Sequence, residues 1–156
     1  MNGKRPVAVV TGSRADFGLL RPVMRAIARS EELELLVFVA GSHLVPPATT
    51  LRDVKGEFHV SELIPMQIAG RVGRLADAES VGKGVSLMAR AIERHHPEWI
   101  VVLGDRIEAF AAALEKEYKT VRYKAYPNEG YYVTSLVGTR QMWLDMLDWF
   151  DRYLKD

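Results

Sequence analysis

The sequence has 156 residues, 48% hydrophobic and 26% charged, which is the composition of a folded domain with a sizeable core. Its formal net charge of +1 provides no basic field for nucleic acid, and the absence of cysteine excludes disulfides, thiolate catalysis and cysteine zinc sites. The apolar run that follows MNGKRP is too short for a secretory signal or a membrane span. We therefore expect a cytoplasmic protein that binds neither nucleic acid nor membranes and holds no metal.

Apolar runs alternate with amphipathic segments along the first half of the chain. Residues 6–10 are a continuous run of Val and Ala after the first Pro, which predicts a parallel strand covered on both faces. A helix with one apolar face is predicted over 16–29, and a second buried strand over 33–40. The polar stretch that follows predicts a short helix around 49–54 and a short strand within 59–65.

The second half continues this alternation after a loop-like stretch at 66–78. Ser80 is a good N-cap residue, so the next helix is predicted to begin there and to run to residue 95. The remaining predicted elements are a strand at 99–103, a helix at 107–118, a strand at 121–126 and a closing helix at 139–154.

Strict alternation of strands and helices predicts an α/β fold, a Rossmann-like three-layer sandwich formed by residues 1–156 as a single domain. Right-handed crossovers favour a parallel five-stranded sheet in the order 3-2-1-4-5. In that order the first and fourth strands are neighbours at the switch point. The turns that follow them, Gly12-Ser13-Arg14 and Gly104-Asp105-Arg106, are then expected to converge on one crevice.

The first of these turns has the features of an anion site. Gly12 permits a sharp turn, the helix after it offers backbone N–H groups, and Arg14 adds a guanidinium fork. The turn has neither the G-x-G-x-x-G fingerprint nor a Walker A loop. A purely structural interpretation, a glycine that ends a strand and a solvated arginine, is equally compatible with the residues.

The second turn has a carboxylate at the end of a buried strand. Asp105 is placed as an acid, a base or a hydrogen-bond anchor, and it is equally suited to cap the helix that follows. Arg106 is able to pair with Asp105 or with a ligand phosphate. His43, after the second strand, is a candidate polar contact at the same edge, although a lone loop histidine is commonly a surface residue. No G-x-S-x-G elbow presents a serine nucleophile.

Three segments together resemble the N-terminal half of the hydrolysing UDP-N-acetylglucosamine 2-epimerases: TGSRADFGLLRPVMRAI, VAGSHL, and ESVGKGVSLMARAIERHHPEWIVVLGDRIEAFAAA, within residues 4–113. The resemblance implies a GT-B-like fold that holds a nucleotide sugar between two Rossmann-like halves. It implies that Arg14 and Arg106 contact UDP beside Gly12 and Ser13, and that Asp105 and His43 belong to the catalytic site. The family needs no cofactor: the sugar loses its C2 proton, UDP is eliminated, and water adds to the glycal intermediate.

The segments ALEKEYKTVRYKAYPNEGYYV and RQMWLDMLDWFDRYLKD, after residue 113, instead resemble the last strand and helix of a prolyl-oligopeptidase-type α/β-hydrolase. In that family the catalytic histidine follows a Glu-Gly pair, whereas here Tyr131 follows Glu129-Gly130. The resemblance therefore implies a chimera, in which residues 114–156 supply a strand and a helix that complete the half-domain 1–113. Glu129 matches no epimerase motif, and its role stays open.

Three functions follow from this mixed resemblance. The first is a folded chimeric scaffold without turnover, since the epimerases' second half, with its own histidine and most of the uridine contacts, is expected to be missing. The second is a module that binds UDP or a UDP-sugar weakly. The third is epimerase activity that needs a separate C-terminal domain. An exposed former domain interface also leaves homo-oligomer formation open.

Overall fold

The computed structural model describes residues 3–103 and 135–153. The chain divides into two compact units, Met1–Lys119 and Thr120–Asp156. The predicted helix at 107–118 and the predicted strand at 121–126 lie outside the described residues, and the single domain expected for 1–156 stays a prediction.

The first unit is built on a parallel sheet in the order β3-β2-β1-β4. This order and the α/β class confirm the corresponding part of the predicted topology. The described residues form four strands rather than the five predicted, because the fifth falls within the part of the chain that is not described. The four strands are β1 (Arg5–Thr11), β2 (Leu33–Ala40), β3 (Glu62–Ile64) and β4 (Trp99–Val101).

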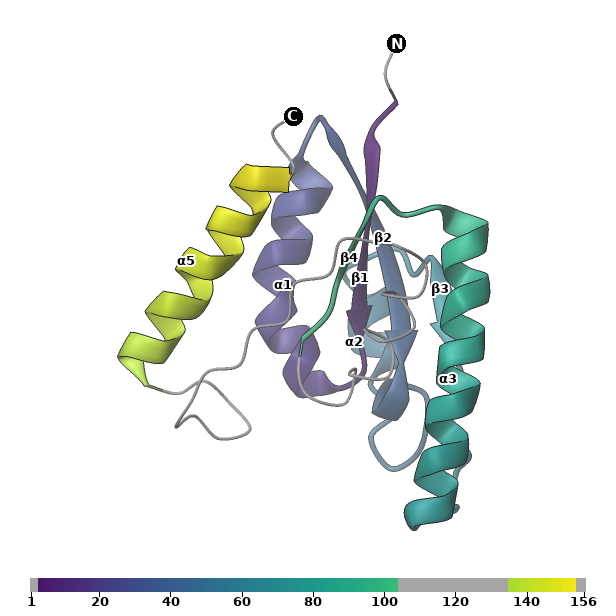
Figure 1. Cartoon of the computed structure of the whole chain (residues 1–156). Coiled ribbons are helices and arrows are strands. Elements are labelled where there is room, and N and C mark those ends of the chain that lie inside the picture. Colours follow the sequence, from purple (N-terminus) through teal and green to yellow (C-terminus); the bar gives the residue numbers. More distant parts are fainter. Residues whose placement is uncertain (1–2, 104–134, 154–156) are drawn as a thin grey trace. The chain divides into compact units, whose positions relative to one another are not determined.

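Helices cover both faces of this sheet, which explains why its central strands are apolar without alternation. Successive side chains of a strand point to opposite faces, so β1 sends Val7 and Val9 into one core cluster and Ala8 and Val10 into another. The first cluster packs against α1 (Arg14–Arg29) and α2 (Leu51–Lys55), and the second against α3 (Arg74–His95). Figure 1 shows the sheet between α1 and α3, the arrangement of a three-layer sandwich.

Two helices of the first unit begin earlier than the sequence predicts. The predicted start of α1 at Asp16 is wrong by two residues, because Ser13 is the N-cap and the helix begins at Arg14. The predicted start of α3 at Ser80 is also wrong. The helix begins at Arg74, directly after a glycine with φ of 105°, and the Ser80 hydroxyl donates to the carbonyl of Ala76 inside the helix (2.7 Å). Good helix formers between 74 and 79 extend α3 past a plausible cap.

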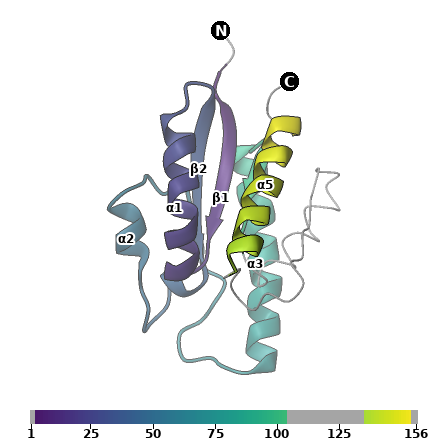
Figure 2. The ribbon, with the colours of Figure 1, turned by 90° about the vertical axis from the view of Figure 1, so that its left-hand side faces the viewer.

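Ion pairs connect α1 to the residues that directly follow α2. Figure 2 looks onto α1, with α2 beside it. The Glu57 carboxylate, just past α2, accepts from Arg21 (2.6 Å) and Arg25, both on α1. Partial burial raises the pKa of Glu57, but the hydrogen bonds from Arg25 and Arg21 outweigh it and lower the pKa from its ordinary value.

The second unit contributes one described helix, α5 (Leu136–Tyr153), which begins three residues before the predicted start at 139. The Ser135 hydroxyl accepts from the backbone N–H of Gly138 (2.9 Å) and so caps its first turn. Over the described ranges 3–103 and 135–153, none of the helices combines the length and apolar character that a membrane crossing requires.

Candidate functional site

The candidate site lies where β1 ends, at the switch point of the sheet. β1 is paired on one side with β2, where Thr11 is in register with Val39, and on the other with β4, where Val9 is in register with Val101. Ligands of open parallel sheets bind where neighbouring strands lead off in opposite directions. The predicted neighbourhood of the first and fourth strands is thus confirmed, while Gly104, Asp105 and Arg106 lie outside the described residues.

Ser13 shapes the turn between β1 and α1. It has an extended backbone (φ −151°, ψ 165°), and its Oγ accepts from the backbone N–H of Asp16 (3.2 Å). Its carbonyl accepts the first helical hydrogen bond, from the N–H of Phe17 (3.0 Å). One residue therefore ends the strand, caps the helix and directs the first turn of α1 toward the carboxyl edge of the sheet.

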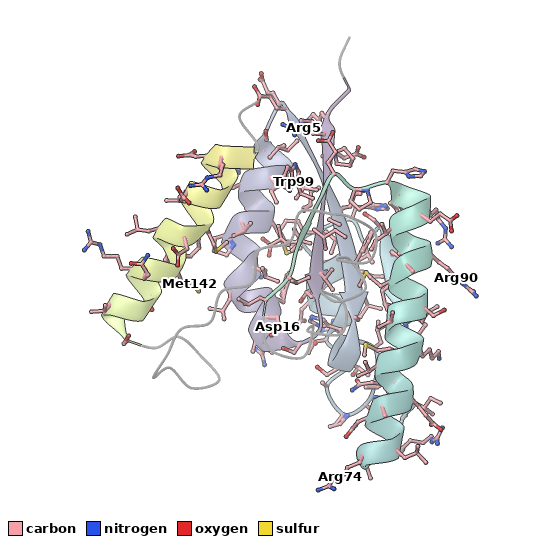
Figure 3. The ribbon with its side chains drawn as sticks, viewed as in Figure 1. Arg5, Asp16, Arg74, Arg90, Trp99 and Met142 are labelled. Atoms are coloured by element: carbon pink, nitrogen blue, oxygen red, sulfur yellow. The ribbon has the colours of Figure 1, made fainter. Side chains whose placement is uncertain are left out.

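The start of α1 offers unused donors to an anion. The backbone N–H groups of Arg14 and Ala15 have no acceptor within the part of the chain that the structure describes, as is usual for the first turn of a helix. The Arg14 side chain is exposed and forms no ion pair with any described residue. Figure 3 shows Asp16 at this end of α1, and its carboxylate lies against the backbone of Gly12, 3.5 Å from where a Cβ of that residue would be.

The residues directly after β2 contact the turn between β1 and α1. They form a short 3-10 helix, η1 (Gly41–His43), that the sequence does not predict. Gly41 has φ of 57°, and a Cβ there would lie 2.6 Å from the carbonyl oxygen of Gly12. The Ser42 hydroxyl donates to that same oxygen (3.0 Å). The two turns are therefore in direct backbone contact.

His43 is buried beneath them, with 1% of its surface exposed. Its Nε2 is 2.9 Å from Thr11 Oγ1 and its Nδ1 is 2.6 Å from Thr50 Oγ1, while the ring packs edge-on against Phe17. Burial lowers the pKa of His43, and Asp16, Asp53 and the Ser13 backbone oppose this only in part. The imidazole is therefore neutral and fully hydrogen-bonded near pH 7.

Four of the predicted site residues, Gly12, Ser13, Arg14 and His43, lie at the same edge of the sheet. Three further residues, Thr11, Ser42 and Thr50, are not predicted from the sequence and provide the polar partners inside the site. Their signal is weak, because a threonine or serine near a strand end is common and the partners lie 32, 30 and 7 residues apart. Across residues 3–103 and 135–153, His, Asp and Glu side chains form no group of three that could hold a metal ion.

Comparison with known proteins relates most of the chain to one family. The family model for UDP-N-acetylglucosamine 2-epimerase matches residues 25–122, a range that includes His43 and the undescribed Asp105 and Arg106. The chain is 32% identical over 112 residues to a hydrolysing UDP-N,N'-diacetylbacillosamine 2-epimerase of Legionella pneumophila. It is 31% identical over 110 residues to a UDP-N-acetylglucosamine 2-epimerase of Neisseria meningitidis.

These matches cover 70% and 69% of this chain but only 29% and 28% of the two relatives, so the chain spans less than a third of their length. Solved structures agree on the fold. A UDP-N-acetylglucosamine 2-epimerase matches 75% of this chain and 32% of its own with a TM-score of 0.61 at 16% identity. A protein from Listeria monocytogenes, described as a possible enzyme of the same kind, matches 75% and 29% with a TM-score of 0.59 at 17% identity.

Proposed function

Because the chain belongs to the UDP-N-acetylglucosamine 2-epimerase family, we propose that the turn formed by Gly12, Ser13 and Arg14 binds the diphosphate of UDP or of a UDP-sugar. The observation that carries the proposal is the pair of unused N–H groups at Arg14 and Ala15, beside an exposed arginine side chain. Backbone donors and a guanidinium at a helix N-terminus are what a diphosphate needs.

We expect Asp105 and Arg106, which follow β4 in the sequence, to complete the proposed site. Their place in it is supported by the pairing of β4 with β1 and by the family match over this part of the chain. Arg106 would add a second cation to the diphosphate. Asp105 would serve as the acid or base of an epimerase. These roles stay predictions, as does the membership of His43 in the catalytic site.

We propose that these 156 residues by themselves bind the ligand weakly and do not turn it over. A site that encloses a ligand on one side leaves much of its surface in water, while association still costs several kcal/mol in lost freedom. A dissociation constant on the order of 1 mM, about −4 kcal/mol, is therefore expected for UDP. Self-association through an uncovered face of this half-site also stays a proposal.

The chimeric origin also stays a proposal. It rests on the hydrolase-like residues in the tail alone, since the family match runs to residue 122, past the expected seam at residue 113. We expect the tail to contribute to stability, so a chain ending at residue 113 should have a lower free energy of unfolding. An equally stable truncated chain would contradict this role of the tail.

Epimerase activity is the second candidate function, and the relatives' names favour it. It would require a second domain to close over the ligand. Incubating the chain with UDP-N-acetylglucosamine and measuring released UDP separates the two candidates. No UDP above the blank is expected from the chain alone; release that disappears when Asp105 is changed to Asn would replace the binding-module proposal with activity.

The binding proposal is tested by the affinity for UDP of wild type and of Arg14→Met, with Arg90→Met as the matched control. Arg90 projects from the outer face of α3, away from the site (Figure 3). Loss of a charge-assisted hydrogen bond at an exposed position should weaken binding about tenfold, or 1.4 kcal/mol. The control should bind like wild type; equal losses in both variants would show non-specific attraction and refute the site.

A further inference from the structure

We propose that Gly41–His43, hereafter the clamp turn, positions the phosphate-binding turn, and that His43 is a positioning residue rather than a group that exchanges protons with a substrate. The inference rests on the proposed function for its ligand, because it concerns the turn expected to hold UDP. The clamp turn itself is defined by contacts within the protein, and these can be tested without any ligand.

Each residue of the clamp turn contacts the end of β1 in a different way. The backbone of Gly41 approaches Gly12 so closely that no side chain fits between them. Ser42 adds a hydrogen bond from its hydroxyl to the Gly12 carbonyl (3.0 Å), and His43 adds one to the Thr11 hydroxyl (2.9 Å). Three successive residues thus fix two successive residues immediately before Ser13.

A series of hydrogen bonds connects the clamp turn to Ser13, the N-cap of α1. When the imidazole proton is on Nε2, it donates to Thr11 Oγ1, which leaves the Thr11 hydroxyl to donate toward the Ser13 carbonyl, 3.5 Å away. The Thr50 hydroxyl then donates to Nδ1 (2.6 Å). Every polar atom of the ring has a partner in this arrangement. The chain ends on the residue that caps α1 and orients its free N–H groups.

The other end of this series of hydrogen bonds, at Thr50, lies in a conformationally constrained loop. Thr49, directly before Thr50, has φ of 32°, in the left-handed region that a β-branched residue rarely adopts. Backbone strain of this kind persists only where the surrounding structure imposes it. The bond between Thr50 and His43 is such a constraint, and it gives the loop between β2 and α2 a role in setting the ligand turn.

The same geometry argues against proton transfer by His43. A general acid or base must come within hydrogen-bond reach of the proton that it moves. Both ring nitrogens are occupied by threonine hydroxyls, and only 1% of the residue is exposed. The contacts therefore assign His43 to the support of the turn.

Amide hydrogen exchange tests the clamp turn in the absence of ligand. Thr11→Val keeps the volume of a fully buried side chain and removes its hydroxyl. We expect the amides of Asp16 and Phe17 to exchange about tenfold faster, whereas Val9, at the centre of β1, changes less than about twofold. Equal acceleration at all three amides would show a general loss of stability and overturn the proposal, as would no change. Ser80→Ala, which removes a hydroxyl from α3, is the control and should alter none of them.

Conservative replacement of the histidine provides the second readout. His43→Gln keeps an amide nitrogen near the position of Nε2, so the Asp16 and Phe17 amides should exchange as slowly as in wild type. In His43→Leu, whose side chain has similar bulk but no hydrogen-bonding group, the same amides should exchange faster. Failure of Gln to differ from Leu would overturn the positioning role. If the Leu variant does not fold, the exchange pattern of Thr11→Val decides alone.

UDP-N-acetylglucosamine separates positioning from proton transfer. We expect its addition to wild type to shift the Arg14 and Ala15 amides while the ring resonances of His43 remain those of one neutral tautomer. A ring that changes protonation on binding would contradict the proposal. If wild type binds neither UDP nor the UDP-sugar, the proposed function fails, and the ligand-free exchange experiment still decides the role of the clamp turn.

Discussion

Gly41→Ala is the substitution for which the structure gives the clearest expected cost. The new Cβ would lie 2.6 Å from the carbonyl oxygen of Gly12, a backbone atom that no rotamer change can move away. The residue also has φ of 57°, where a side chain costs roughly 1–2 kcal/mol. Displacing packed backbone costs about 1–3 kcal/mol more.

The unfolded chain offsets part of this cost, because alanine has less conformational freedom to lose than glycine, by about 0.4–1 kcal/mol. The net decrease in the free energy of unfolding is then about 1–4.6 kcal/mol, which corresponds to a decrease in Tm of roughly 2–18 °C for a chain of this size. Urea and thermal unfolding followed by circular dichroism measure both quantities.

Gly18→Ala is the matched control. Gly18 lies inside α1, and a Cβ there would meet no atom within 4 Å, so alanine should stabilise the chain by about 0.5–1 kcal/mol through helix propensity. A Gly41→Ala protein as stable as wild type, or stabilised like the control, would refute the close approach of the two turns on which the clamp depends.

Further tests concern packing and pH. Leu20 and Leu19 are neighbours on α1, and their side chains are 3% and 52% exposed. Leu20→Ala should lower the free energy of unfolding by about 2–5 kcal/mol, and Leu19→Ala by less than about 1 kcal/mol. Similar decreases for the two variants in urea unfolding would show that the buried face of α1 is assigned wrongly. Burial lowers the pKa of His43, so the unfolded chain takes up this proton before the folded chain does as pH falls below about 6.5. The free energy of unfolding should therefore decrease as pH falls through that range, with a smaller slope in His43→Gln. An unchanged slope would contradict this. Partial burial raises the pKa of Glu57, but the hydrogen bonds from its two arginine partners outweigh this and lower the pKa overall. The ionised carboxylate therefore stabilises the fold above its unfolded pKa, and this stabilisation is lost as pH falls through the folded pKa. Glu57→Gln should reduce this acidic decrease in the free energy of unfolding, and a decrease of undiminished size would assign it to other carboxylates.

The sequence was a good guide wherever one local signal decides the structure. The apolar runs of β1 and β2 predict buried parallel strands because both faces of these strands are covered, and the order of the four described strands follows from right-handed crossovers. The helix starts were predicted less well. Ser80 has the chemistry of a cap, but a glycine with positive φ and the residues after it begin α3 earlier.

The site was only partly predictable, for a physical reason. One short segment contains Gly12, Ser13 and Arg14, so their spacing alone indicates an anion site. The environment of His43, in contrast, depends on residues that are distant in the sequence. Nothing local to GSHL shows that its imidazole is enclosed between hydroxyls of Thr11 and Thr50. A loop histidine is therefore judged a surface or catalytic residue until the two strand ends are seen in contact.

An amide chemical-shift map of the isotope-labelled chain titrated with UDP shows whether the turn at Gly12–Arg14 binds a diphosphate. We expect shifts confined to residues 12–17 and 104–106, saturating with a dissociation constant on the order of 1 mM, and largely absent in Arg14→Met. A well-dispersed spectrum that millimolar UDP leaves unmoved, or shifts centred elsewhere on the fold, would contradict it.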